Sequence, residues 1–448
     1  MFQTRNFSRR RVLQGAGLLV GGLLLPGKAP AQGGAKRLAG VTLNVSTFSA
    51  PFPKILIKWL PEFEQLTGAK VVYDTPSFPV YNQRADLELS TGGSAYDVVN
   101  VTFIYSSRWI NAGWLTPLDD FIRDPNKTPA DWDVDDFLPG LRAPETGKDG
   151  KLYGIPWSVD TFISAAARFD LFKDAGLGFP DTTDDLFDTL KATHGKDKVA
   201  GFVTDNHYGW SFVPFLQAFG GNVFRNPPDD LTPVLDTPEA IAAAEYFARI
   251  VKDFGPNGAI SYTPDQVVKA LQSGRVNYSA IGQTYLAQLG DSGSKVAGTS
   301  AFGLAPRGPA GRFPGVAVHG LGIPAASKNK EAAWTFIQWA LSKQNTRRAL
   351  VEENLASPTR RSDFESPEFK TSSTINGYDI AGIVRESIDI SAKGGYMKYR
   401  TVPVYPQVDQ QLNKAIANIA SGQLSARQAM EQAQAGSIAE LKRAGVAL

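Results

Sequence analysis

The chain has 448 residues, 43% of them hydrophobic, no cysteine, and 46 basic against 44 acidic side chains. This near-neutral, interspersed charge provides no basic stripe for a phosphate backbone, which excludes nucleic acid as a partner. The absence of cysteine excludes a disulfide framework and a lipid-anchored cysteine, and the length predicts two lobes.

The first 31 residues predict an export signal. Arginines at positions 9–11 precede an apolar run over 15–25 and the small-residue site at 29–31, which is the order of a signal peptide. The run is shorter than the roughly 20 residues that span a bilayer. Residues 8–13 resemble the twin-arginine motif, and a Sec signal is the open alternative. We predict cleavage after Ala31 and a periplasmic, slightly acidic mature chain, because this segment holds five basic and no acidic side chains.

The mature chain begins with strands and helices in alternation. Alternating apolar residues at 41–45 predict a strand, and helical spacing from Ile55 to Gly68 predicts a helix. Two more strands, at 71–73 and 96–101, flank a helix at about 81–90. This order predicts a parallel, doubly wound sheet, in which ligands bind beyond the carboxyl ends of the strands. The loops after the first and third strands therefore provide the first candidate ligand contacts: Phe48, Ser49, Thr102, Phe103 and Tyr105.

Residues 150–177 predict a crossing between lobes. Pro156 disfavours helix and biases Ile155 toward an extended conformation, and a helical pattern that ends at 169–172 is expected to follow. Trp157 and Asp160 come just after the proline and would present a flat apolar face and a carboxylate to a cleft. The plainer alternatives are a core tryptophan and a helix-capping aspartate.

The second half of the chain supplies further candidates. Trp210 lies at the mouth of an apolar helix, although it too has a core alternative. A strand at 276–281 leads into a loop at 282–285, and extended residues at 316–324 predict a second crossing. Asn329 is expected to cap a helix. The candidates from this half are Trp210, Gln283, Tyr285, His319, Arg400 and Tyr405. The three histidines lie far apart in the sequence, so we predict no metal and no cofactor.

Four parts of the chain carry a resemblance to a known family. They are residues 95–99 with 112–119, 152–157 with 169–176, 323–334, and 418–422 with 425–429. In this order they resemble a family 1 extracellular solute-binding protein of an ABC importer. The resemblance implies an α/β Venus-flytrap fold: two doubly wound lobes, each flanked by helices and joined by hinge strands. The implied lobes are 36–155 with 317–365 and 156–316 with 366–448.

The resemblance also implies a function without catalysis. A monomer would bind a carbohydrate, close on it and deliver it to an inner-membrane ABC permease. Asp160 would bind sugar hydroxyls, and Trp210 and Tyr285 would stack on sugar rings. The loop at 101–105 departs from the family pattern because it has no carboxylate or arginine, which argues against maltodextrin as the ligand.

Three alternatives to a carbohydrate-binding protein stay open. A glycerol-phosphate-type ligand would need clustered arginines, for which Arg360, Arg361 and Arg400 are candidates. A polyamine would need several carboxylates in the cleft. A secreted glycoside hydrolase would need a second carboxylate paired with Asp160, and no partner stands out in the sequence.

Overall fold

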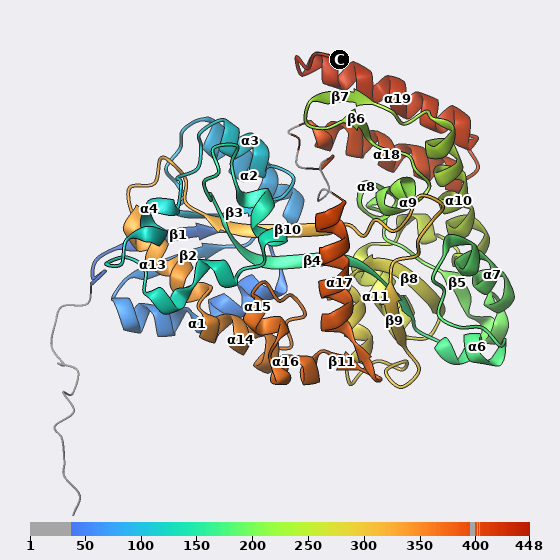
Figure 1. The fold of residues 1–448 in the computed structure, drawn as a ribbon, viewed down its shortest axis with the longest axis horizontal. Coiled ribbons are helices and arrows are strands. Elements are labelled where there is room, and N and C mark those ends of the chain that lie inside the picture. Colours follow the sequence, from blue (N-terminus) through green and yellow to red (C-terminus); the bar gives the residue numbers. More distant parts are fainter. Residues whose placement is uncertain (1–36, 395–398, 401, 403) are drawn as a thin grey trace, which may run out of the picture.

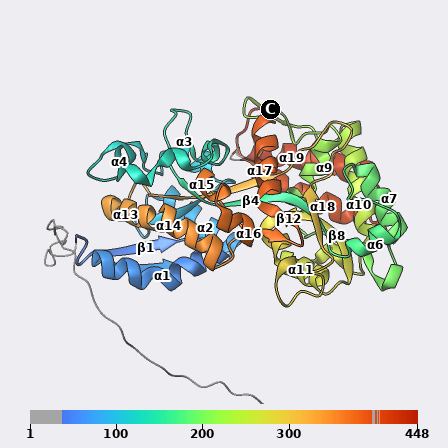
Figure 2. The same ribbon diagram turned by 60° about the horizontal axis from the view of Figure 1, so that its bottom comes forward.

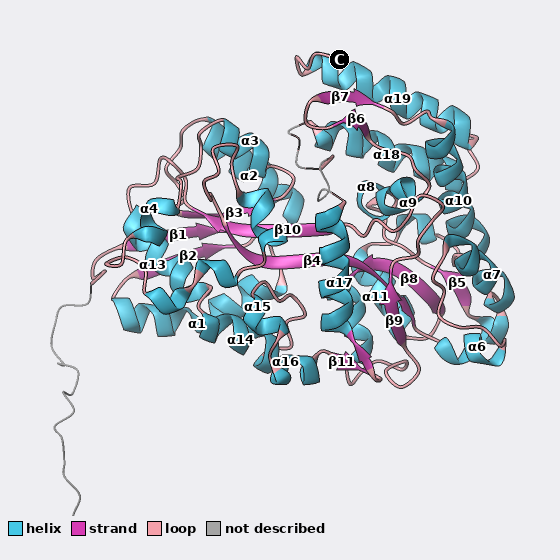
Figure 3. Cartoon of the chain, in the orientation of Figure 1, coloured by secondary structure: helices cyan, strands magenta, loops and turns pink. Residues whose placement is uncertain are grey.

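The computed structural model describes residues 37–394, 399, 400, 402 and 404–448, which form two α/β lobes side by side (Figure 1). The predicted signal peptide, residues 1–31, lies outside the described residues. Helices pack around the strands in both lobes (Figure 3), so the predicted two-lobed α/β class is confirmed. Within the described part of the chain, no helix is long and apolar enough to cross a membrane.

Lobe 1 begins with the predicted βαβαβ unit. Its elements are β1 (Thr42–Ser46), α1 (Pro51–Thr67), β2 (Lys70–Asp74), α2 (Phe78–Ser90) and β3 (Val98–Thr102). Both β2 and β3 pair in parallel with β1, because each connecting helix returns the chain to the same end of the sheet. Helix α1 starts before Ile55, at Pro51, since proline suits the first turn of a helix. It ends at Gly68, whose φ of 81° is left-handed.

Five further α-helices belong to the described part of lobe 1. They are α3 (Ser106–Asn111), α4 (Asp119–Arg123), α5 (Pro139–Arg142), α13 (Lys330–Ala340) and α14 (Lys343–Glu352). Asn329 directly precedes α13, but its side chain makes no capping bond to that helix. Instead its Nδ2 donates to Asp97 Oδ1 at 3.2 Å. Asn329 is therefore the N-cap residue of α13, as predicted, but its side chain is turned toward the buried Asp97 carboxylate and makes no capping bond.

Two strands run from one lobe to the other. They are β4 (Ile155–Ala166) and β10 (Val316–Gly322). Strand β10 pairs antiparallel with β3 on one side and with the first half of β4 on the other. The second half of β4 pairs with β8 (Val276–Gly282) and β9 (Ala301–Leu304). The strands thus follow one path, β2-β1-β3-β10-β4-β8, which ends at β5 (Ala200–Phe202) in lobe 2.

The chain after the first crossing differs from the expectation. No helix lies between Pro156 and Phe169, because β4 continues to Ala166 with strands on both sides. Helix α6 (Phe169–Asp174) begins only at Phe169. The loop expected at 282–285 is instead largely taken up by the helical turn α12 (Gln283–Leu286). The described part of lobe 2 contains a small hairpin and seven further α-helices. They are β6 (Phe224–Asn226), β7 (Asp230–Pro233), α7 (Thr183–Thr193), α8 (Tyr208–Ser211), α9 (Val213–Ala218), α10 (Pro238–Phe254), α11 (Pro264–Gln272), α18 (Tyr405–Ala420) and α19 (Ala426–Arg443).

A third connection between the lobes follows α14. It comprises α15 (Arg361–Phe364), α16 (Pro367–Ser372), β11 (Thr374–Ile375), β12 (Tyr378–Asp379) and α17 (Ile380–Lys393). Helix α16 contacts α14 of lobe 1, whereas α17 contacts β4, β9 and α5. Figure 2 shows α17 between the lobes. The described chain therefore passes between the lobes at β4, at β10 and in this segment.

Candidate ligand-binding cleft

A cavity of about 1270 Å³ lies between the lobes. Its walls come from the loop after β1, from the crossings β4 and β10, and from α8, α12, α14 and α17. Nine of the predicted site residues line it. They are Phe48, Ser49, Phe103, Trp157, Asp160, Trp210, Tyr285, His319 and Arg400. Residues far apart in the sequence therefore meet where the two lobes face each other.

The other four predicted residues lie behind the cavity wall. Thr102 is buried at the end of β3, and the ring of Tyr105 stacks on Trp109 with 5.7 Å between centroids. The buried Gln283 amide donates to Val159 O at 2.7 Å, and Tyr405 donates to Gly209 O at 2.5 Å. In this structure the polar groups of Gln283 and Tyr405 hold wall elements in place.

One side of the cavity is aromatic. Trp157 stacks on Phe52 with a centroid distance of 5.4 Å, and Phe48 lies 5.7 Å from Trp157. The Trp157 indole donates from Nε1 to Asn100 Oδ1 at 2.8 Å, which sets the orientation of its ring. His319 packs against the same indole at 5.7 Å. Burial, with a smaller contribution from Arg400, lowers the pKa of His319 to about 3, so its imidazole is neutral at pH 7.

Asp160 supplies a carboxylate to the cavity wall. Its Oδ1 accepts from Thr284 Oγ1 at 2.9 Å and from Thr284 N at 3.3 Å, in the first turn of α12. Asp160 therefore binds the first turn of α12 from strand β4 and also lies on the cavity wall, whereas Gly282 is the N-cap residue of that turn. Burial raises the pKa of Asp160 to about 6, against the lowering effect of the Thr284 bonds. A Cβ on Gly282 would lie 2.0 Å from Asp160 Oδ2, so only glycine leaves room for this carboxylate.

Two carboxylates that the sequence analysis did not nominate, those of Asp205 and Asp409, lie on the lobe 2 side of the cavity. Asp205 and Asp409 both line the cavity together with Arg400 and His207. Burial raises the pKa of each aspartate, while the charges of Arg400 and His207 act to lower it. Asp205 follows β5, a strand too short to recognise by periodicity. Asp409 lies within α18, where an acidic residue carries no signal in a single sequence.

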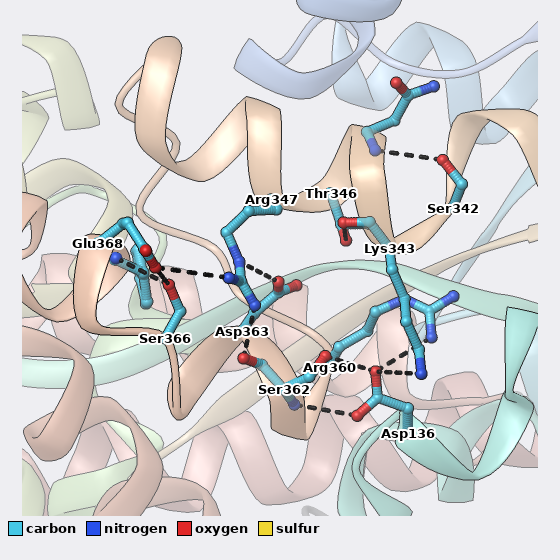
Figure 4. Close-up of polar contacts among 12 residues, drawn as sticks. Asp136, Ser342, Lys343, Thr346, Arg347, Arg360, Ser362, Asp363, Ser366 and Glu368 are labelled. Carbon is cyan, nitrogen blue, oxygen red and sulfur yellow. Dashed lines mark hydrogen bonds and ion pairs between the residues drawn. The ribbon is translucent and has the colours of Figure 1, made fainter. Parts of the chain in front are cut away.

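Arg360, a sequence candidate for phosphate binding, lies elsewhere. It is fully buried in lobe 1, where its Nη1 contacts Asp136 Oδ2 at 3.3 Å and its Nη2 donates to Leu341 O at 2.7 Å. Asp136 also accepts from Ser362 Oγ at 2.6 Å. Figure 4 shows the contacts of Asp136 with Arg360 and Ser362 within a polar network that also includes Asp363. Arg360 thus ties the segment after α14 to lobe 1 and does not line the cavity.

Two α/β lobes, joined by strands and enclosing a cavity with aromatic and carboxylate walls, define a two-lobed protein that binds a small molecule. The model of the family described as "Bacterial extracellular solute-binding protein" matches residues 44–347, so the chain belongs to this family. The family resemblance predicted from the sequence is thereby confirmed. Because the family comprises extracellular binding proteins, the chain is an exported binding protein and not an enzyme.

Similar proteins are described as binding polyols. The chain is 26% identical to a mannitol-binding protein of Pseudomonas aeruginosa, over 89% of each chain. It is 24% identical to an erythritol/L-threitol-binding protein of Mycolicibacterium smegmatis, over 84% of this chain and 86% of that protein. A solved ABC transporter solute-binding protein of Agrobacterium vitis with bound D-mannitol is 25% identical. It has a TM-score of 0.78 and is matched over 91% of this chain and 99% of that one.

Proposed function

We propose that the chain captures a carbohydrate for an ABC importer and that its ligand is an acyclic polyol. The observation that carries this proposal is the meeting of Trp157, Asp160 and Trp210 on one cavity. Trp157 and Asp160 come from the first crossing, and Trp210 comes from α8 of lobe 2. Apolar ring faces beside a carboxylate suit a ligand with C–H faces and many hydroxyls.

The binding free energy available from such contacts is sufficient for micromolar affinity. Covering an aromatic face removes on the order of 100–150 Å² of apolar area, or about 3 kcal/mol at 25 cal/mol per Å². Each ligand hydroxyl buried without a partner costs about 1–3 kcal/mol, so the polar groups decide which ligand is accepted. Micromolar affinity corresponds to about −8 kcal/mol, which a few stacked faces and satisfied hydroxyls reach after the costs of association.

The relatives support a polyol in particular. The similar proteins named above are described as binding mannitol and erythritol or L-threitol, and the solved relative holds D-mannitol. These ligands are acyclic and densely hydroxylated. A sugar ring is the neighbouring class, since it offers the same hydroxyls with a flatter apolar face.

A polyamine is the second candidate, and one observation favours it. Asp160, Asp205 and Asp409 all line the cavity, which provides the several carboxylates that such a ligand requires. A glycerol-phosphate-type ligand has lost support because Arg360 is buried in lobe 1. The remaining cavity guanidinium, that of Arg400, shares the cavity with these carboxylates, which repel phosphate.

The route and partner of the protein follow from the same proposal. Residues 1–31 would direct export through the twin-arginine pathway to the periplasm, with cleavage after Ala31. There a monomer would close about its crossings, with lobe boundaries near residues 155, 317 and 365, and an inner-membrane permease would read the closed form. Mass measurement of the exported protein and scattering with and without ligand test these points.

Thermal unfolding of the mature chain with added compounds tests the proposed function. The panel contains mannitol, ribitol, erythritol, glucose, maltose, spermidine and glycerol 3-phosphate. A ligand present at a hundredfold excess over its Kd stabilises the folded chain by about 2.7 kcal/mol. We expect the alditols to raise the Tm most, with calorimetry giving their Kd. A response to spermidine alone would favour the second candidate, and a response to glycerol 3-phosphate alone would overturn the proposal.

A further inference from the structure

Arg400 lines the cavity. It is buried, and part of its guanidinium has no hydrogen-bond partner among the described residues. Its side chain belongs to a residue only 5% exposed, and its guanidinium carbon lies 4.6 Å from the ring centroid of Phe103 and 5.0 Å from that of Trp210. Phe103 comes from lobe 1 and Trp210 from lobe 2, so the guanidinium contacts rings of both lobes. Within the described part of the chain, its Nε and Nη1 are buried without a hydrogen-bond partner. A buried N–H without an acceptor costs free energy, which a ligand oxygen would recover.

Carboxylates line the same cavity as this cation. Arg400 acts electrostatically on both Asp205 and Asp409, and Asp205 in turn acts on Asp160. The Asp409 carboxylate sits directly over Gly209, where a Cβ would lie 1.7 Å from Asp409 Oδ1. Replacement of that glycine would push the carboxylate away. The cavity therefore offers donors on Arg400 and acceptors on three aspartates to the same ligand.

The charge of a ligand determines whether it can bind Arg400 and the aspartates at the same time. A hydroxyl both donates and accepts, so neighbouring hydroxyls can satisfy the guanidinium and the carboxylates together. A ligand carboxylate or phosphate could bond Arg400 but would face three aspartates. An ammonium group could bond the aspartates but would face Arg400. Asp291 and Glu353 line the cavity as well. Because the carboxylates that line the cavity outnumber the guanidinium of Arg400, anions meet more repulsion than amines do.

We propose that Arg400, Asp205 and Asp409 together determine specificity by charge and make this cleft select uncharged polyhydroxy compounds. The inference rests on the proposed function and deepens it. Arg400 donates to ligand oxygens and repels ammonium groups. Asp205 and Asp409 accept hydrogen bonds from ligand hydroxyls and repel anions. Arg400 is thus the residue that separates a polyol site from the polyamine site that the carboxylates alone would make.

Three probes on one carbon skeleton test this inference by calorimetry. They are sorbitol, 1-amino-1-deoxysorbitol and gluconate, which differ only at the first carbon: hydroxyl, ammonium or carboxylate. For the native protein we expect the order sorbitol, then the amine, then gluconate, with at least a tenfold difference between the first and the last. Tighter binding of gluconate or of the amine than of sorbitol would overturn the inference.

Two variants move the preference in opposite directions. In Arg400→Gln the affinity ratio of amine to sorbitol should rise at least tenfold, and in Asp205→Asn the ratio of gluconate to sorbitol should rise. Arg400→Lys keeps the charge and should keep the native order. Arg249→Gln is the matched control, because Arg249 also stacks on a ring, that of Phe187 at 4.5 Å, but lies outside the cavity.

The outcomes separate the two proposals. If sorbitol binds but both ratios stay within twofold of native in Arg400→Gln and Asp205→Asn, the charge inference falls and the proposed function stands. Should Arg400→Gln fail to fold, the Asp205→Asn ratio and the native order decide the matter. If no probe binds and no alditol or sugar raises the Tm, both proposals fall.

Discussion

Replacement of Asp160 by asparagine should raise the free energy of unfolding of the ligand-free protein at neutral pH and weaken ligand binding. Burial raises the pKa of this carboxyl from 3.8 to about 6, so the folded state holds the proton more tightly than the unfolded state. The group therefore stabilises the fold most below about pH 4, and this contribution is lost as the pH rises through about 6. At 1.36 kcal/mol per unit, the ionised carboxylate costs at most about 3 kcal/mol at pH 7.5. Asparagine removes that cost and retains an acceptor for Thr284.

The same substitution removes a charged acceptor from the cavity. Hydrogen bonds to charged groups contribute about 1.5–3 kcal/mol and neutral ones about 0.5–1.5. Asp160→Asn should therefore weaken alditol binding by about 1–2 kcal/mol, or roughly 5- to 30-fold in Kd. Urea unfolding at pH 4 and pH 7.5 measures the stability, and calorimetry with mannitol measures the affinity. The stability difference should be near zero at pH 4 and largest at pH 7.5.

Asp136 provides a matched control. It too accepts from both the backbone N–H and the hydroxyl of one residue, Ser362. Burial acts to raise the pKa of Asp136, but the Ser362 bonds and the charges of Arg360 and Lys343 lower it overall. Asp136→Asn should therefore destabilise the protein at pH 7.5 and leave ligand affinity unchanged. A less stable Asp160→Asn protein at pH 7.5, or a Kd within twofold of native, would refute the reasoning about Asp160.

Three further variants test the cavity and its support. Gly282→Ala should weaken mannitol binding at least tenfold in calorimetry, because its Cβ would displace the Asp160 carboxylate; native affinity would contradict this. Trp157→Phe removes the bond to Asn100 and should lower the free energy of unfolding by about 1–3 kcal/mol in urea, whereas unchanged stability would show that the bond contributes nothing. Arg360→Ala should cost about 3–5 kcal/mol of stability, as breaking a buried ion pair does, with alditol affinity retained in whatever fraction stays folded; lost affinity in folded protein would place Arg360 in the binding site.

Local patterns in the chain were sufficient for the architecture. The apolar alternation at 41–45 and the helical spacing up to Gly68 predicted a strand and a helix that the structure contains. Pro156 predicted the extended crossing correctly, since a proline restricts its own backbone and that of its neighbour. The helix expected before Phe169 was wrong, because cross-strand pairing extends β4 to Ala166 and no local signal reports such pairing.

The cavity itself was decided by tertiary structure. Sequence alone could nominate Trp157 and Asp160, because they follow a recognisable crossing, and the family resemblance added Trp210. The sequence could not nominate Asp205 or Asp409, since Asp205 follows a three-residue strand and Asp409 lies in an ordinary helix. Their nearness to Arg400 depends on how lobe 2 folds and how it faces lobe 1. Periodicity records which side of an element is buried, whereas a binding site depends on which elements meet, and that is a property of long-range packing.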